Sequence, residues 1–115
     1  MVARIIEFGQ AGLGHQRQIF FVSTGGFDNH DGLVAEHRPL LSAIDAGLSG
    51  FHAAMTSMGA ADQVTSFTAS DFGRTLVSNG DGTDHGWGAH HLVVGGSVAG
   101  NDVYGEVPVT ADDGP

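Results

Sequence analysis

Aspartate and histidine residues gather in three short stretches of the sequence that are also rich in glycine. The residues in these stretches that we single out as metal ligands are Asp28, His30, Asp71, Asp84, His85 and His90. Carboxylate oxygen and neutral imidazole nitrogen are good ligands for zinc or manganese, and carboxylates alone suit magnesium or calcium. We therefore expect a site for a divalent metal, with zinc, manganese, magnesium and calcium all left open.

Arg74 lies in the second stretch, Ser70-Asp71-Phe72-Gly73-Arg74-Thr75. A metal in such a site would lower the pKa of a bound water or polarise a phosphoryl or sulfuryl oxygen. The guanidinium of Arg74 would add a fork of donors for an anionic small-molecule or ester substrate, which makes it the candidate catalytic residue. The alternative is that Arg74 holds its loop by pairing with Asp71 or Asp84.

Structural roles compete with the chemical ones at several polar positions. Asp31 and Asp81 lie in glycine-rich loops, where aspartate often serves to make a turn. Trp87 is expected to anchor its loop by packing, and His15, His37 and His52 are expected on the surface or against a helix.

Two familiar motifs match poorly. The run from 79 to 84 has Asp84 where a helix–loop–helix calcium site requires glycine, and the twelfth position is His90 instead of glutamate. A Gly-x-Ser-x-Gly nucleophile turn is missing from the sequence.

Composition narrows the class of protein. The chain has 115 residues, which suits one domain, and 13 acidic residues against four arginines give a net charge of −9. This balance argues against nucleic acid or an anionic membrane surface as partner, because both require a basic patch. Without cysteine there can be no disulfide or thiolate site. No apolar run approaches the roughly 18 to 20 residues that membrane insertion needs, and no signal peptide is visible.

Apolar spacing predicts two helices. The first covers 2–8 and is broken by the glycine-rich run from 9 to 14. The second covers 33–58, where apolar residues recur at helical spacing. Pro39 fits poorly inside it, so the helix either begins near Arg38 or kinks there. Gly59 is the expected terminator.

Three strands are expected at 18–22, 64–69 and 91–94. The first is a continuous apolar run, typical of a strand buried on both faces of a parallel sheet. Strand, helix and strand form a βαβ unit, so we predict an α/β fold with a parallel sheet and flanking helices. Ligands in such folds sit at the carboxyl ends of the strands, where the three polar stretches fall. A long loop is expected from 78 to 90, and 110–115 is expected to be a frayed tail.

Four blocks of sequence carry a family resemblance. They are Gln18-Ile19-Phe20-Phe21-Val22, Gly25-Gly26-Phe27-Asp28-Asn29-His30, the Ser70 to Thr75 block, and Asn79-Gly80-Asp81-Gly82-Thr83-Asp84-His85-Gly86-Trp87-Gly88. With Gly95-Gly96 and Val103-Tyr104-Gly105 they resemble the DUF1501 family of bacterial proteins over nearly the whole chain.

The resemblance implies a fold like the carboxyl-terminal part of alkaline phosphatases and sulfatases, and a periplasmic or extracellular location. It implies that Asp28 and His30 form a first ligand group, Asp71 a second, and His85 or His90 a last one. That superfamily often has a metal-binding histidine at the position of Phe72. The phenylalanine at this position argues against a two-zinc centre. Family members are longer, so 1–115 is expected to be a single partial domain. Self-association or a missing amino-terminal half would cover its apolar faces.

Three hypotheses for function follow. The first is a metal-dependent hydrolase-like domain acting on phosphate or sulfate esters, with the activity carried by a longer parent chain. The second is a non-catalytic exported metal-binding or scaffold module. The third is an unstable remnant without activity, which would melt without cooperativity.

Overall fold

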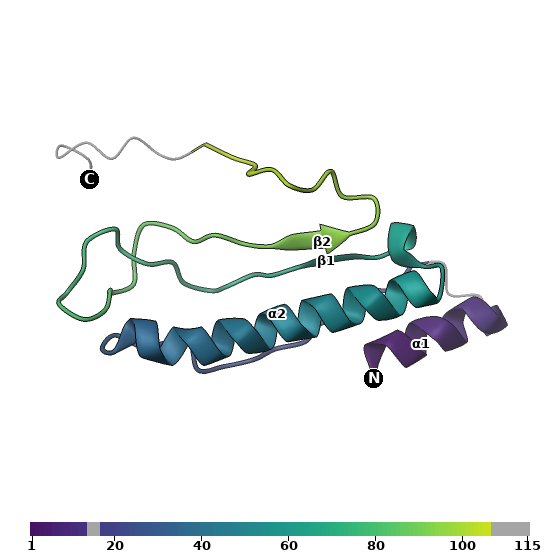
Figure 1. Cartoon of the computed structure of the whole chain (residues 1–115), viewed down its shortest axis with the longest axis horizontal. Helices are drawn as coiled ribbons and strands as arrows, with labels where there is room; N and C mark the ends of the chain where they lie inside the picture. The colour runs from purple at the N-terminus through teal and green to yellow at the C-terminus, as the bar shows by residue number, and fades with distance from the viewer. Residues whose placement is uncertain (14–16, 107–115) are drawn as a thin grey trace.

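The computed structural model describes residues 1–13 and 17–106 (Figure 1). Its elements are helix α1 (Val2–Phe8), the π-helical turn η1 (Gly9–Leu13), helix α2 (Leu33–Ser57), the 3-10 turn η2 (Ala61–Gln63) and strands β1 (Thr65–Phe67) and β2 (Val93–Gly95). The predictions that concern Gly14, His15 and the tail from 110 to 115 lie outside the described residues.

Both predicted helices are confirmed. The helical path of α1 continues through η1 to Gly12, whose φ of 116° interrupts it. Helix α2 begins at Leu33, so of the two alternatives left open at Pro39 the start near Arg38 is wrong, and Pro39 lies inside the helix. Gly59 has a φ of 67° and donates its N–H to the carbonyl of Thr56, which ends the helix as expected.

The predicted α/β fold, with its βαβ unit and parallel sheet like that of alkaline phosphatases, is wrong. Among the described residues the sheet consists of β1 and β2, and they pair antiparallel with Thr65 opposite Gly95. The chain between them folds back on itself, as the antiparallel bridges of Arg74 with His85 and Gly88 show. Antiparallel strands need only such a turn, whereas parallel strands require a crossover between them. The two strands therefore form the base of a long hairpin.

The expected buried strand at 18–22 is also wrong. The segment is extended but belongs to no strand, and the side chains of Ile19 and Phe21 are 99% and 91% exposed. The strand expected at 64–69 is confirmed in its middle as β1, and the strand expected at 91–94 forms two residues later as β2.

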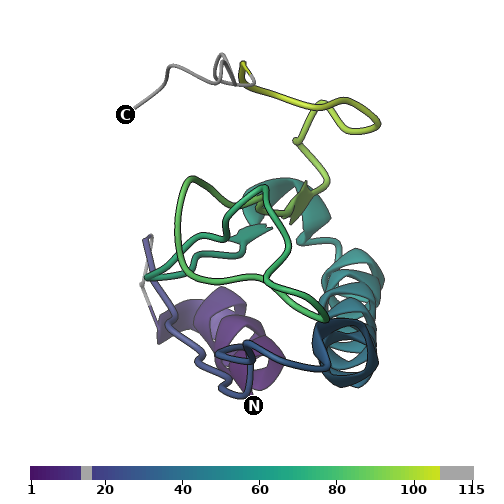
Figure 2. The same cartoon turned by 90° about the vertical axis from the view of Figure 1, so that its left-hand side faces the viewer.

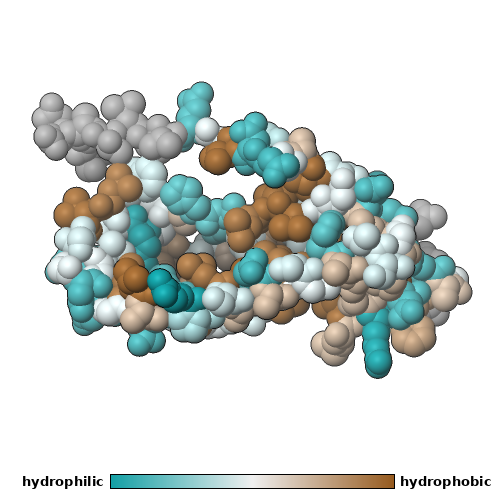
Figure 3. All heavy atoms as spheres, in the orientation of Figure 1, coloured by the Kyte–Doolittle hydropathy of each residue, from teal (hydrophilic) through white to brown (hydrophobic). Residues whose placement is uncertain are grey.

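The described part of the chain is elongated, with principal extents of 56 × 28 × 22 Å. Its fully buried apolar side chains are Met55 at the end of α2 and Ala60 just after it. Apolar residues consequently remain on the surface, as the brown atoms of Figure 3 show. None of the described helices combines the length and the hydropathy that a membrane span requires.

One end of the molecule gathers the polar loops. The hairpin tip lies beside the beginning of α2 in both Figure 1 and Figure 2. The segment that leads into α2 lies at the same end. Residues separated by about half of the sequence therefore meet there.

Candidate metal centre

The site is built where the hairpin tip docks on the loop that precedes α2. Gly82 lies against the backbone carbonyl of His30 so closely that a Cβ atom at this position would collide with it. Glycine has no Cβ, so it permits this approach of two backbones. Asn79 donates its side-chain N–H to the same His30 carbonyl at 3.2 Å. These contacts bring His30 and the tip residues together.

Asp81 secures the docking by capping α2 from the hairpin. Its carbonyl accepts the N–H of Leu33 at 3.2 Å, and its carboxylate accepts the N–H of Gly32 at 3.1 Å. The first N–H groups of a helix lack partners within the helix and carry partial positive charge, so a carboxylate there is favourable. Asp81 therefore caps the beginning of α2, a structural role that differs from the turn-making role considered for it.

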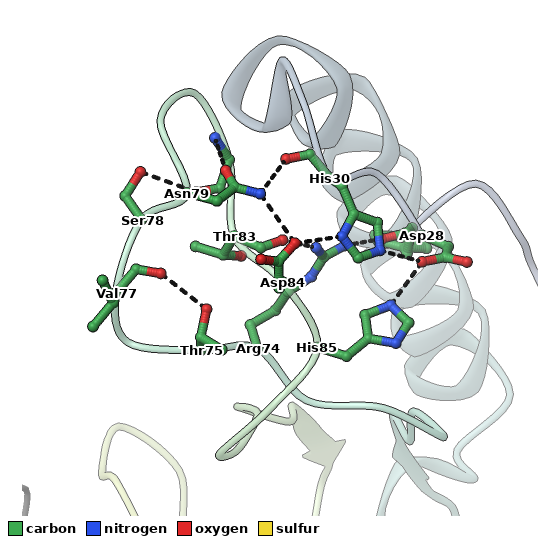
Figure 4. A network of polar contacts seen from close by, with 12 residues as sticks. Asp28, His30, Arg74, Thr75, Val77, Ser78, Asn79, Thr83, Asp84 and His85 are labelled. Carbon is green, nitrogen blue, oxygen red and sulfur yellow. Dashed lines mark hydrogen bonds and ion pairs between the residues drawn. The ribbon is translucent and has the colours of Figure 1, made fainter.

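Three potential ligand atoms converge at the docked loops (Figure 4). They come from Asp28, His30 and His85, and all lie within 4.8 Å of one another. One carboxylate oxygen of Asp28, Oδ1, is 2.7 Å from His85 Nε2 and 3.2 Å from His30 Nε2. Two imidazoles and one carboxylate therefore point at a common location from two different loops.

Asp84 lies behind this group and orients His30. Its Oδ1 is 2.7 Å from His30 Nδ1 and also accepts an N–H from Asn79 at 3.0 Å. An ionised carboxylate can only accept, so Nδ1 carries a proton and Nε2 is directed at Asp28. The hydrogen bond to Asp84 raises the pKa of His30 above its ordinary value of 6.5. The same bond holds the pKa of Asp84 below its ordinary value of 3.8.

The Asp28 carboxylate is also held in its charged form. The hydrogen bond from His85 is the largest cause, and it lowers the pKa of Asp28 from its ordinary value of 3.8. The side chains are open to solvent, at 67% for Asp28, 43% for His30 and 42% for His85. The site is therefore an exposed, preassembled group of donors that a dissolved ion could reach.

The remaining predicted site residues contribute no ligand atom to this group. Asp71 and His90 are exposed and are not among the three convergent ligands. Arg74 donates to the backbone carbonyls of Phe27 and Thr83 and forms no ion pair with Asp71 or Asp84.

Phe72 and Asn79 are two residues of the site to which the sequence alone assigned no role there. The Phe72 ring stacks on His85 with 4.1 Å between ring centroids. Asn79 links His30 to Asp84. Their positions in the sequence could have indicated these roles, because each residue lies in a polar glycine-rich loop beside the predicted ligands.

Comparison with known proteins identifies the family. A family model described as "Protein of unknown function (DUF1501)" matches residues 12–114. No curated protein and no solved structure matches the chain.

Proposed function

The chain belongs to the DUF1501 family, and we propose that it is a divalent-metal-binding module with Asp28, His30 and His85 as ligands. The observation that supports this most strongly is the convergence of the three donor atoms within 4.8 Å. Zinc bonds of about 2.0–2.1 Å in a tetrahedral site place neighbouring ligand atoms ~3.3 Å apart. The separations of 2.7 and 3.2 Å from Asp28 Oδ1 to the two imidazoles need only a small expansion to reach that arrangement.

The donor set favours zinc among the four metals considered. Imidazole suits zinc and other late first-row ions, whereas magnesium, calcium and manganese are better suited by carboxylate, carbonyl and water oxygens. Here two of the three donors are imidazole nitrogens. Asp84 provides the carboxylate behind a ligating histidine that is common at zinc sites, where it fixes the tautomer and increases the basicity of the ring.

Calorimetric titration with zinc tests the proposal. Wild-type protein should bind one zinc ion per chain, and Asp28→Ala or His85→Ala should abolish the binding. Asp71→Ala and His90→Ala are matched controls that remove the same residue types outside the group, and they should bind as wild type. Undiminished zinc uptake by Asp28→Ala and His85→Ala would rule out the site.

A hydrolytic role is the second candidate, and one observation favours it. Three protein ligands leave at least one position on zinc for water, as in catalytic sites, and the ligand side chains are open to solvent. A zinc-bound water would have a pKa low enough to act as a nucleophile on a phosphate or sulfate ester. Zinc-dependent turnover of such esters, lost on adding a chelator and in His85→Ala, would support the enzyme. Zinc binding without turnover would support the non-catalytic module.

A further inference from the structure

The side chain of Arg74 connects the two loops that supply the ligands. One guanidinium nitrogen, Nη2, donates to the carbonyl of Phe27 at 2.5 Å, and Nη1 donates to the carbonyl of Thr83 at 2.6 Å. Phe27 immediately precedes Asp28, and Thr83 is followed by Asp84 and His85. A single planar fork thus fixes the backbone beside the ligands of both loops.

The backbone of Arg74 is itself fastened to the hairpin. Its N–H donates to the carbonyl of Gly88 at 2.8 Å, and the N–H of Thr75 donates to the carbonyl of Asp84 at 2.9 Å. Arg74 also pairs with His85 across an antiparallel bridge. The side chain therefore starts from a fixed point in the hairpin and reaches the loop that carries Asp28.

Phe72 extends this arrangement to the ligand His85. The two rings are nearly parallel, at 12°, with centroids 4.1 Å apart, and the guanidinium carbon of Arg74 lies 5.3 Å from the Phe72 centroid. Ser70 holds the backbone of Phe72 by accepting its N–H and donating to its carbonyl. Stacking restricts rotation of the His85 ring, whose Nε2 is directed at Asp28.

We propose that Arg74 and Phe72 are positioning residues of the metal centre, an inference that rests on the proposed metal-binding function. Arg74 sets the distance between the two ligand loops, and Phe72 sets the orientation of the His85 imidazole. This replaces the anion-binding role expected for Arg74, since its fork is directed at two carbonyl oxygens.

Zinc calorimetry on conservative variants tests the inference. Substitution of a residue that orients a metal ligand typically lowers the metal affinity by about 10- to 100-fold. The loss of zinc affinity in Arg74→Lys should fall in this range, because a lysine ammonium cannot donate to both carbonyls as the guanidinium does. Phe72→Leu should weaken binding by a similar factor, and Phe72→Tyr, which keeps the ring, should restore it. Arg38→Lys is the control, because Arg38 lies in helix α2 and takes no part in the contacts with Phe27 and Thr83 that Arg74 makes.

Two further measurements separate positioning from general stability and from substrate binding. Visible absorption of the cobalt-substituted protein should change in Arg74→Lys and Phe72→Leu but not in Phe72→Tyr, because the spectrum reports ligand geometry. A sulfate titration of the zinc form should give the same result for wild type and Arg74→Lys. Loss of sulfate binding in Arg74→Lys with unchanged zinc affinity would overturn the inference.

The failures of the two proposals are distinguishable. If His85→Ala still binds zinc, the metal site itself is wrong. If His85→Ala loses zinc while Arg74→Lys and Phe72→Leu bind it as wild type, the site stands and only the positioning role is wrong. Should Arg74→Lys fail to fold, the Phe72→Leu and Phe72→Tyr pair still tests the positioning of His85: equal zinc affinity in both variants would overturn it.

Discussion

Replacing Gly82 by alanine should both destabilise the protein and weaken its metal site. The added Cβ would meet the carbonyl of His30, and its distance to the carbonyl carbon would be 2.7 Å. The obstacle is backbone, so it cannot be relieved by rotating a side chain. The two loops are also tied together, since Asn79 donates to the His30 carbonyl and Leu33 donates to the carbonyl of Asp81. The substitution must therefore separate the loops or strain them.

The size of the effect can be worked out from the chain length. Overpacking of this kind costs about 1–3 kcal/mol in the free energy of unfolding. With 115 residues and about 2.1 cal/mol/K per residue, the unfolding entropy is about 0.24 kcal/mol/K. The melting temperature should consequently fall by about 4–12 °C. Displacement of His30 should also lower zinc affinity by about 10-fold or more.

Thermal melting followed by circular dichroism and zinc calorimetry would measure the two effects. Gly88→Ala is the matched control, because Gly88 lies in the same hairpin and a Cβ there would meet nothing within 4 Å. Gly82→Ala should melt lower than Gly88→Ala and bind zinc more weakly. Equal melting temperatures and equal zinc affinities for the two variants would refute the close docking of the loops.

Four further predictions concern the polar groups around the site. Asp84→Asn should lower zinc affinity by about 10-fold in calorimetry, because the amide does not hold the Nδ1 proton of His30 as a carboxylate does; an unchanged affinity would exclude the orienting role. Zinc must displace a proton from His30, whose pKa is raised, so zinc affinity should increase as the pH rises through 6.5 and level off above the raised pKa. In the absence of metal, the stabilisation from protonated His30 should be fully present below pH 6.5 and be lost as the pH rises through the raised pKa of the folded state, which melting at a series of pH values would show. Asp81→Ala should reduce the free energy of unfolding by about 1 kcal/mol in chemical denaturation, because it removes a cap from the N–H of Gly32, and equal stability would contradict that role.

Local sequence patterns were sufficient for the helices but not for the sheet. Apolar spacing determines which face of a helix is buried, and a glycine such as Gly59 ends it, so α1 and the length of α2 follow from neighbouring residues. A strand depends on partners that lie elsewhere in the chain. The apolar run at 18–22 is typical of a buried strand, yet its pattern does not specify whether a neighbour is present. The antiparallel pairing of β1 with β2 likewise depends on the chain turning back between Arg74 and His85.

The ligands were predictable as residue types but their separate roles were not. The Asp28-Asn29-His30 and Asp84-His85 pairs stand out because chemically capable residues lie close together in glycine-rich loops. Asp28 and His30 both face the common location, whereas only His85 of the second pair does, and this difference depends on how the loops dock. Asp84 turns toward His30 Nδ1, and Phe72 instead of its neighbour Asp71 packs on His85. These outcomes follow from long-range contacts such as that of Gly82 with His30.

X-ray absorption at the zinc edge, on protein loaded with one equivalent of zinc, tests the central claim most directly. The metal should be surrounded by two imidazole nitrogens from His30 and His85 and by a carboxylate oxygen from Asp28, with water completing the shell. The imidazole signal should decrease in His85→Ala. A shell made only of oxygen atoms, or the same two-imidazole shell in His85→Ala, would contradict the assignment.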